Sequence, residues 1–172
     1  MDSALTAARD AARPSDSFAQ VRSADYTTRY IRVGAGQPVV VVDAIMSSES
    51  FWPDLIGHLA DGRRLIIPEV QGGPDRFTPW LRSFLDGMGL PPVTLLATGE
   101  LCLAALEFAL LEPERVERLV LVPSGSAEET GLVSVMTPSV GAKSITMLIV
   151  RRDYPAAEAI PLIGRFLRGE MP

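Results

Sequence analysis

The stretch Pro38-Val39-Val40-Val41-Val42-Asp43-Ala44 places four consecutive valines directly before an acid. A continuous β-branched run of this length is typical of a strand that is buried on both faces of a sheet. Such strands occur in parallel sheets whose two faces are covered by helices. The stretch therefore predicts the centre of a parallel sheet, with Asp43 at the carboxyl end of its strand.

Strands and helices alternate on both sides of this run. Before it, Thr27–Val33 alternates and leads into Gly34-Ala35-Gly36, which predicts a strand and a turn. After it, the patterns predict a helix over 50–61, a strand over 64–68, a helix over 77–88, a strand over 93–97, a helix over 100–111 and a strand over 116–122. Because each later connection is long enough for a helix, we expect an α/β fold: a mostly parallel twisted sheet with helices on both faces.

The two ends of the chain carry weaker patterns. Residues 1–25 are predicted to form a flexible or helical N-terminal arm, and residues 26–172 a single domain without a cap domain. After Ser124, strands are predicted over 132–136 and 145–150, followed by an amphipathic helix over 156–168 that Pro161 interrupts. The apolar residues of the 100–111 helix are expected mostly inside, namely Leu103, Leu106, Phe108, Ala109 and Leu110.

Composition limits the chemistry. The 172 residues carry a formal net charge of −5, with one histidine and one cysteine. A single cysteine excludes an internal disulfide framework, and together the two counts exclude multi-cysteine zinc sites and multi-histidine metal centres. We therefore expect no metal and no cofactor. The arginines are scattered among acids, which argues against nucleic acid as a partner, and no apolar run reaches the ~18 residues that span a bilayer. We expect a cytoplasmic protein.

The order of several segments resembles the α/β-hydrolase fold family over roughly residues 27–124. The stretches that carry the resemblance are Pro38–Ala44, Phe51-Trp52, Leu59–Glu69, Leu95-Leu96-Ala97-Thr98-Gly99-Glu100, Ala105–Ala109 and Glu112–Val122. In this resemblance Leu95–Glu100 matches the nucleophile elbow, the sharp turn between a strand and a helix that exposes a catalytic serine. The family also needs a later acid and a histidine near the C-terminus.

The chain departs from this pattern at each catalytic position. The serine position is Gly99, followed by Glu100 and Leu101, and Asp43-Ala44 replaces the family's His-Gly. The only histidine, His58, precedes the elbow. At the C-terminus two alignments stay open: Asp153 stands at the histidine position, or Ile145–Pro155 matches the penultimate strand and the chain stops before the histidine strand. In both cases the resemblance implies a shortened member without a Ser-His-acid triad.

The residues that could carry function lie at the carboxyl edge of the predicted sheet, where ligands bind in open α/β folds. Asp43 could orient a ligand, act as a base, or cap the loop Ile45–Ser48. Glu100 could be a first-turn acid or, flanked by Thr98 and Cys102, a general base or shifted nucleophile. Asp153 is the third acid that could point toward this edge. The resemblance places the Ile45 amide at the oxyanion-hole position. The candidate ligand pocket comprises Asp43, Ala44, Ile45, Gly99, Glu100 and Ser124.

Other chemically notable side chains are interpreted as structural. His58 is predicted to be a surface or boundary residue of the 50–61 helix. Cys102 is predicted to be a packed thiol, because no histidine base stands near it in the elbow pattern. Trp80 is predicted to be a packing residue.

Two functional hypotheses follow. In the first, the protein is a non-hydrolytic relative that binds a small-molecule ligand or a protein partner, and we expect a homodimer because the missing cap leaves the apolar segment 131–141 uncovered. In the second, it is a cofactor-independent cyclase, isomerase or lyase in which Asp43, Glu100 and Asp153 transfer protons, with high-GC bacterial secondary metabolism as a setting. A residual esterase that uses Glu100 or Ser124 is disfavoured.

Overall fold

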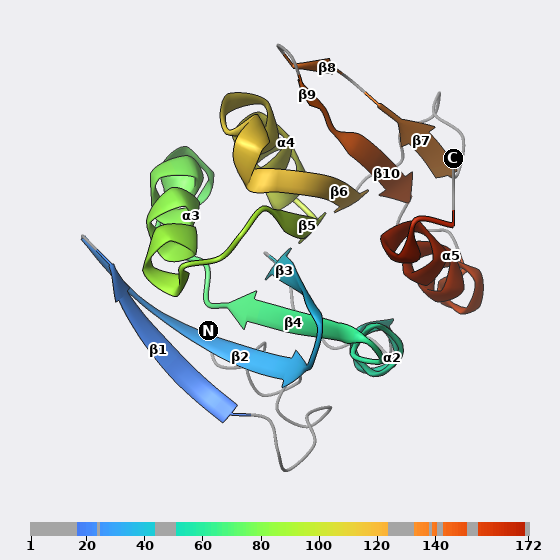
Figure 1. Cartoon of the computed structure of the whole chain (residues 1–172), viewed down its shortest axis with the longest axis horizontal. Coiled ribbons are helices and arrows are strands. Elements are labelled where there is room, and N and C mark those ends of the chain that lie inside the picture. The colour runs from blue at the N-terminus through green and yellow to red at the C-terminus, as the bar shows by residue number, and fades with distance from the viewer. Residues whose placement is uncertain are drawn as a thin grey trace.

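A computed structural model describes residues 17–23, 25–43, 51–123, 133–137, 139–140, 143–150 and 155–170. In this part of the chain the main element is an eight-stranded sheet with the order β1-β2-β4-β3-β5-β6-β10-β7 (Figure 1). Its strands are β1 (Ser17–Ser23), β2 (Tyr26–Gly34), β3 (Gln37–Asp43), β4 (Arg63–Pro68), β5 (Val93–Thr98), β6 (Val116–Val122), β7 (Val133–Met136) and β10 (Thr146–Val150). The short strands β8 (Ser139–Val140) and β9 (Lys143–Ser144) pair with each other and form a separate two-stranded sheet.

The centre of the sheet is parallel, which confirms the predicted fold class. The five strands β4, β3, β5, β6 and β10 run parallel to one another, whereas the flanking strands β2 and β7 pair antiparallel with β4 and β10. The crossovers contain α2 (Phe51–Leu59), α3 (Pro74–Met88) and α4 (Leu101–Leu111), which is followed by the 3-10 turn η1 (Pro113–Arg115). The helix α5 (Ala156–Arg168) follows β10.

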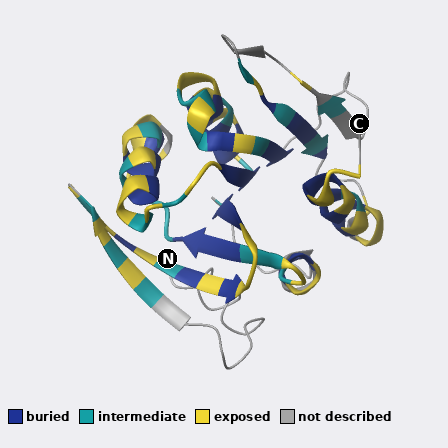
Figure 2. Ribbon diagram, in the orientation of Figure 1, coloured by how far each residue is buried: buried dark blue, intermediate teal, exposed yellow. Residues whose placement is uncertain are grey.

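Helices cover both faces of the sheet, and each face has its own core. On one face α2 and α5 pack together, and Val39 and Val41 of β3 point into that core. On the other face α3 and α4 pack together, and Val40 and Val42 point into the second core. The valine run is therefore buried on both sides, as its composition predicts. Figure 2 shows the central strands buried and the outer sides of the helices exposed.

The N-terminal boundary of the folded domain differs from the prediction. Residues 17–23 were assigned to the arm, but they form β1, which pairs with β2 along its whole length. This edge strand is held by α3: the Ser83 hydroxyl donates to the Ser23 carbonyl, at 3.0 Å, and Val21 packs against the α3/α4 core. A Cβ on Gly87 would lie 2.6 Å from the Ser23 Cβ, so this glycine permits the close approach. The first part of the predicted arm, residues 1–16, lies outside the described residues.

Two helices differ in detail from their predictions. Helix α5 continues through Pro161, which is exposed to solvent and removes only one backbone donor from the helix. In α4, Leu103 and Leu110 are expected inside but are 74% and 43% exposed. Leu111, the last residue of the helix, is also exposed, at 59%.

Among the described residues, no helix combines the length and apolar composition needed to cross a membrane.

Candidate functional site

The carboxyl ends of β3, β5 and β6 meet at one edge of the sheet. Asp43, the last residue of β3, is the register partner of Thr98, the last residue of β5. Thr98 is in turn the register partner of Val122 at the end of β6. Parallel strands bring the residues that follow their carboxyl ends together at the same edge. The structure therefore places Asp43 beside the predicted elbow.

The elbow itself is a sharp strand-to-helix turn. Gly99 follows β5 with a φ of 62°, in the left-handed region, and its amide donates to the Val122 carbonyl at 2.9 Å. Glu100 then has right-handed helical angles and directly precedes α4. A glycine adopts the left-handed conformation without the steric cost that a Cβ would bring. The strand, turn and helix expected around residues 95–111 are confirmed, with Gly99 at the turn.

A side-chain hydrogen bond joins the two central strands at this edge. The Thr98 hydroxyl donates to Oδ1 of Asp43. Thr98 is 8% exposed, whereas Asp43 is half-buried. A hydrogen bond from a hydroxyl restricts the rotamers of the carboxylate that accepts it. Asp43 is thus oriented by Thr98, the residue that directly precedes the glycine of the elbow.

Cys102 lies beneath the elbow in the first turn of α4. Its thiol is buried and donates to the Ala97 carbonyl at 3.3 Å. Burial raises the pKa of the thiol to about 12; a backbone hydrogen bond with Val122 opposes this rise, and the charge of Asp43 adds to it. A thiol with this pKa is protonated at neutral pH and is a poor nucleophile. The interpretation of Cys102 as a packed thiol is confirmed.

The raised pKa of Cys102 predicts a loss of stability in alkaline solution. Below the ordinary pKa of 9.0 the thiol is protonated in both the folded and the unfolded chain, and its contribution to stability is fully present. Between 9.0 and about 12 only the unfolded chain ionises, so the free energy of unfolding falls by about 1.4 kcal/mol per pH unit. Urea denaturation at about pH 8 and about pH 10 should show a fall in the free energy of unfolding that is about 1 kcal/mol larger for the wild type than for Cys102→Ala. Equal falls in the two proteins would contradict the assignment.

Glu100, interpreted from the sequence as a first-turn acid, directly precedes α4, whose first turn holds no acid, whereas His58 lies on the surface as predicted. Glu100 is exposed at the N-terminal cap of α4, and its side chain makes no capping hydrogen bond. His58 is exposed in the last turn of α2. Because α2 returns the chain from the carboxyl end of β3 to the amino end of β4, its last turn lies near the edge opposite Gly99. A Cβ on Gly164 of α5 would lie 2.9 Å from Nε2 of His58, so the imidazole rests against α5.

Four predicted site residues lie outside the described residues: Ala44, Ile45, Ser124 and Asp153. The chain leaves β10 at Val150 and is described again from Pro155, just before α5. Asp153 therefore belongs to the connection between β10, the second strand from one edge of the sheet, and the helix that packs beside α2. Among the described residues, no group of three or more His, Cys, Asp or Glu side chains could hold a metal ion.

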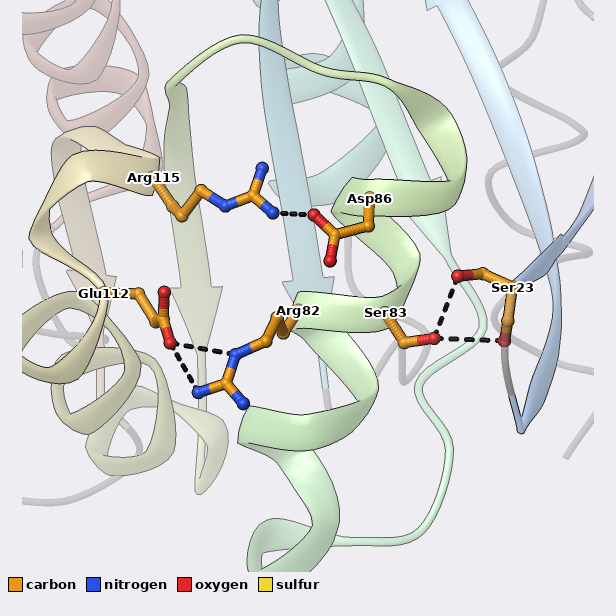
Figure 3. Close-up of polar contacts among 6 residues, drawn as sticks. All are labelled: Ser23, Arg82, Ser83, Asp86, Glu112 and Arg115. Atoms are coloured by element: carbon orange, nitrogen blue, oxygen red, sulfur yellow. Dashed lines mark hydrogen bonds and ion pairs between the residues drawn. The ribbon is translucent and has the colours of Figure 1, made fainter.

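Polar contacts that the sequence patterns did not reveal fix α3 against its neighbours (Figure 3). Nε of Arg82 donates to Glu112 at 2.8 Å, and Arg115 pairs with Asp86 in the next turn of α3. Both contacts join α3 to the segment that follows α4, so they hold the helix that begins at the elbow. The partners are about 30 residues apart in the chain, and no local spacing signals them.

A second set of contacts holds the end of α5. Arg63, at the start of β4, donates to the Leu167 carbonyl, and Arg118 of β6 donates to the Phe166 carbonyl. The Arg118 guanidinium also lies 5.7 Å from the centre of the Phe166 ring. Cations at a helix C-terminus satisfy its last carbonyls and stabilise its dipole. These arginines fix the helix that follows the Asp153 connection.

Comparison with known proteins gives matches among solved structures only. No family model matches the sequence, and no curated protein does. Naproxen esterase from Bacillus subtilis aligns at 18% identity with a TM-score of 0.58, over 70% of this chain and 47% of that enzyme. Carboxylesterase CesB from the same organism aligns at 18% identity and a TM-score of 0.57, over 71% of this chain and 50% of the enzyme. Haloalkane dehalogenase DatA from Agrobacterium tumefaciens aligns at 18% identity and a TM-score of 0.54, over 66% and 43%.

These neighbours are enzymes of the α/β-hydrolase fold, and the chain spans half of their length or less. At such low identity the likeness bears on architecture and not on activity. It agrees with the strand order, the parallel centre and the strand-turn-helix at Gly99. The chain therefore has an α/β-hydrolase-like fold.

Proposed function

We propose that the protein is a non-hydrolytic relative of the α/β-hydrolases that binds a small-molecule ligand or a protein partner. The observation that carries the proposal is Gly99 at the elbow. Its φ of 62° is the backbone conformation of that turn, but glycine offers no hydroxyl or thiol for attack on a carbonyl. A covalent acyl-enzyme step needs such a nucleophile together with a base within hydrogen-bonding distance.

The side chains around Gly99 support this proposal. The Thr98 hydroxyl donates to Asp43, the Cys102 thiol is buried with a raised pKa, and the exposed His58 lies near the opposite edge of the sheet. The contact between Thr98 and Asp43 includes no imidazole, because the one histidine of the sequence is His58. The oriented carboxylate of Asp43 is instead suited to hold a hydrogen-bond donor of a ligand, with Ala44, Ile45, Glu100 and Ser124 as further proposed pocket residues.

Because the one histidine of the sequence, His58, lies near the opposite edge of the sheet, we predict that restoring the elbow serine does not restore hydrolysis. We expect Gly99→Ser to cleave p-nitrophenyl acetate within about twofold of the wild type, because a positioned base contributes roughly 10²–10⁴-fold to such a reaction. Gly89→Ser is the matched control: Gly89 ends α3 with a φ of 59°, and a Cβ there would meet nothing within 4 Å. A rate for Gly99→Ser about tenfold above that of Gly89→Ser, or its selective labelling by a fluorophosphonate, would overturn the proposal.

The binding half of the proposal has a separate test. Native mass spectrometry of the protein purified from its own cells should show a species heavier than one bare chain, and denaturation should remove the added mass. A small-molecule increment identifies a ligand, and a doubled mass identifies the proposed homodimer. A single species with the mass of the bare chain contradicts both.

A second candidate function is proton transfer without a covalent nucleophile. The favouring observation is the Thr98–Asp43 hydrogen bond, which orients a half-buried carboxylate at the ligand-binding edge of the sheet. In this hypothesis Asp43, Glu100 and Asp153 share acid and base roles, as in a cyclase, isomerase or lyase.

A proton-exchange experiment distinguishes the two candidate functions. If the acids transfer protons at carbon, the wild type should accelerate deuterium exchange into cyclohexanone in D2O, and the variant Asp43→Asn/Glu100→Gln/Asp153→Asn should lose about 10²-fold or more of that rate. Asp61→Asn changes an exposed acid in the turn after α2 and should leave the rate unchanged. Equal exchange with the wild type, with the triple variant and without protein would contradict proton transfer and favour the binding protein.

A further inference from the structure

We draw no further inference here: the strongest candidate, the solvent-facing apolar surface that Leu103, Leu110 and Leu111 form on α4, carries nothing because no described part of the structure shows what covers it.

Discussion

Replacing Trp80 by alanine is expected to lower the free energy of unfolding by about 3–5 kcal/mol, the range for removing a large aromatic from a core. Trp80 is fully buried in the core between the sheet and helices α3 and α4. Its ring stacks on Phe84, with centroids 6.0 Å apart, and tilts against Phe77 at 5.6 Å. The interpretation of Trp80 as a packing residue is confirmed. The substitution would leave a cavity among these rings that the surrounding strands cannot fill.

The indole also satisfies a buried polar group. Its Nε1 donates to the hydroxyl of Thr28 on β2 at 3.0 Å, and Thr28 is 1% exposed. Trp80→Ala therefore leaves that hydroxyl without its tryptophan donor, at a further cost of roughly 1–3 kcal/mol where nothing replaces it. Together these losses approach the whole stability of an ordinary domain, which is about 5–15 kcal/mol.

Milder variants keep the measurement possible if Trp80→Ala does not fold. Trp80→Phe retains an aromatic ring and removes the donor, while Thr28→Val removes the acceptor in a similar volume. In urea denaturation we expect the double variant to cost less than the sum of the two single variants, by about 0.5–3 kcal/mol, because neither polar group is then left alone in the core. Additive costs would show that the hydrogen bond does not couple α3 to β2.

The central strands could be predicted because their sequence is dictated by their position. Each valine of Val39–Val42 enters one core or the other, so a polar residue has no place in the run. Strand β1 lacks that signature. It is a partly polar edge strand that pairs with β2, and its contacts with α3 depend on Ser83 and Gly87, some 60 residues later in the chain. A pattern within residues 17–23 cannot report contacts of that kind.

In the candidate site, too, a local sequence pattern predicts one feature, whereas another depends on contacts between distant parts of the chain. The elbow was predictable because a buried strand, a glycine and a helix follow one another within residues 93–111. The contact between Thr98 and Asp43 depends on the register of β5 against β3, and a shift by one residue would turn Thr98 to the other face. That register is set by packing across the whole sheet. The exposure of Leu103 and Leu110 was missed for a related reason: an apolar composition does not tell how much of a helix its neighbours cover.

The turn between β2 and β3 should tolerate substitution least. Gly34 has a φ of 74°, and a Cβ added there would lie 2.3 Å from the Arg63 carbonyl oxygen and 2.6 Å from that of Ala60. Both obstacles are backbone oxygens, one directly after α2 and one at the first residue of β4, so no side-chain rotation relieves them. The left-handed conformation costs a residue with a Cβ about 1–2 kcal/mol, and overpacking adds about 1–3 kcal/mol. We expect Gly34→Ala to lower the free energy of unfolding by about 3 kcal/mol or more.

A substitution at Gly62 distinguishes the cost of the left-handed backbone conformation from the cost of the steric clash. It lies in the neighbouring turn with a φ of 81°, but a Cβ there would meet nothing within 4 Å. Gly62→Ala should therefore show the conformational cost alone, about 1–2 kcal/mol, in the same urea titration. The difference between the two variants measures the contact between the β2–β3 turn and the α2–β4 turn. Equal costs would mean that the two turns can separate freely, in which case the close approach of their backbones does not help to fix β3 and its terminal Asp43 in the sheet.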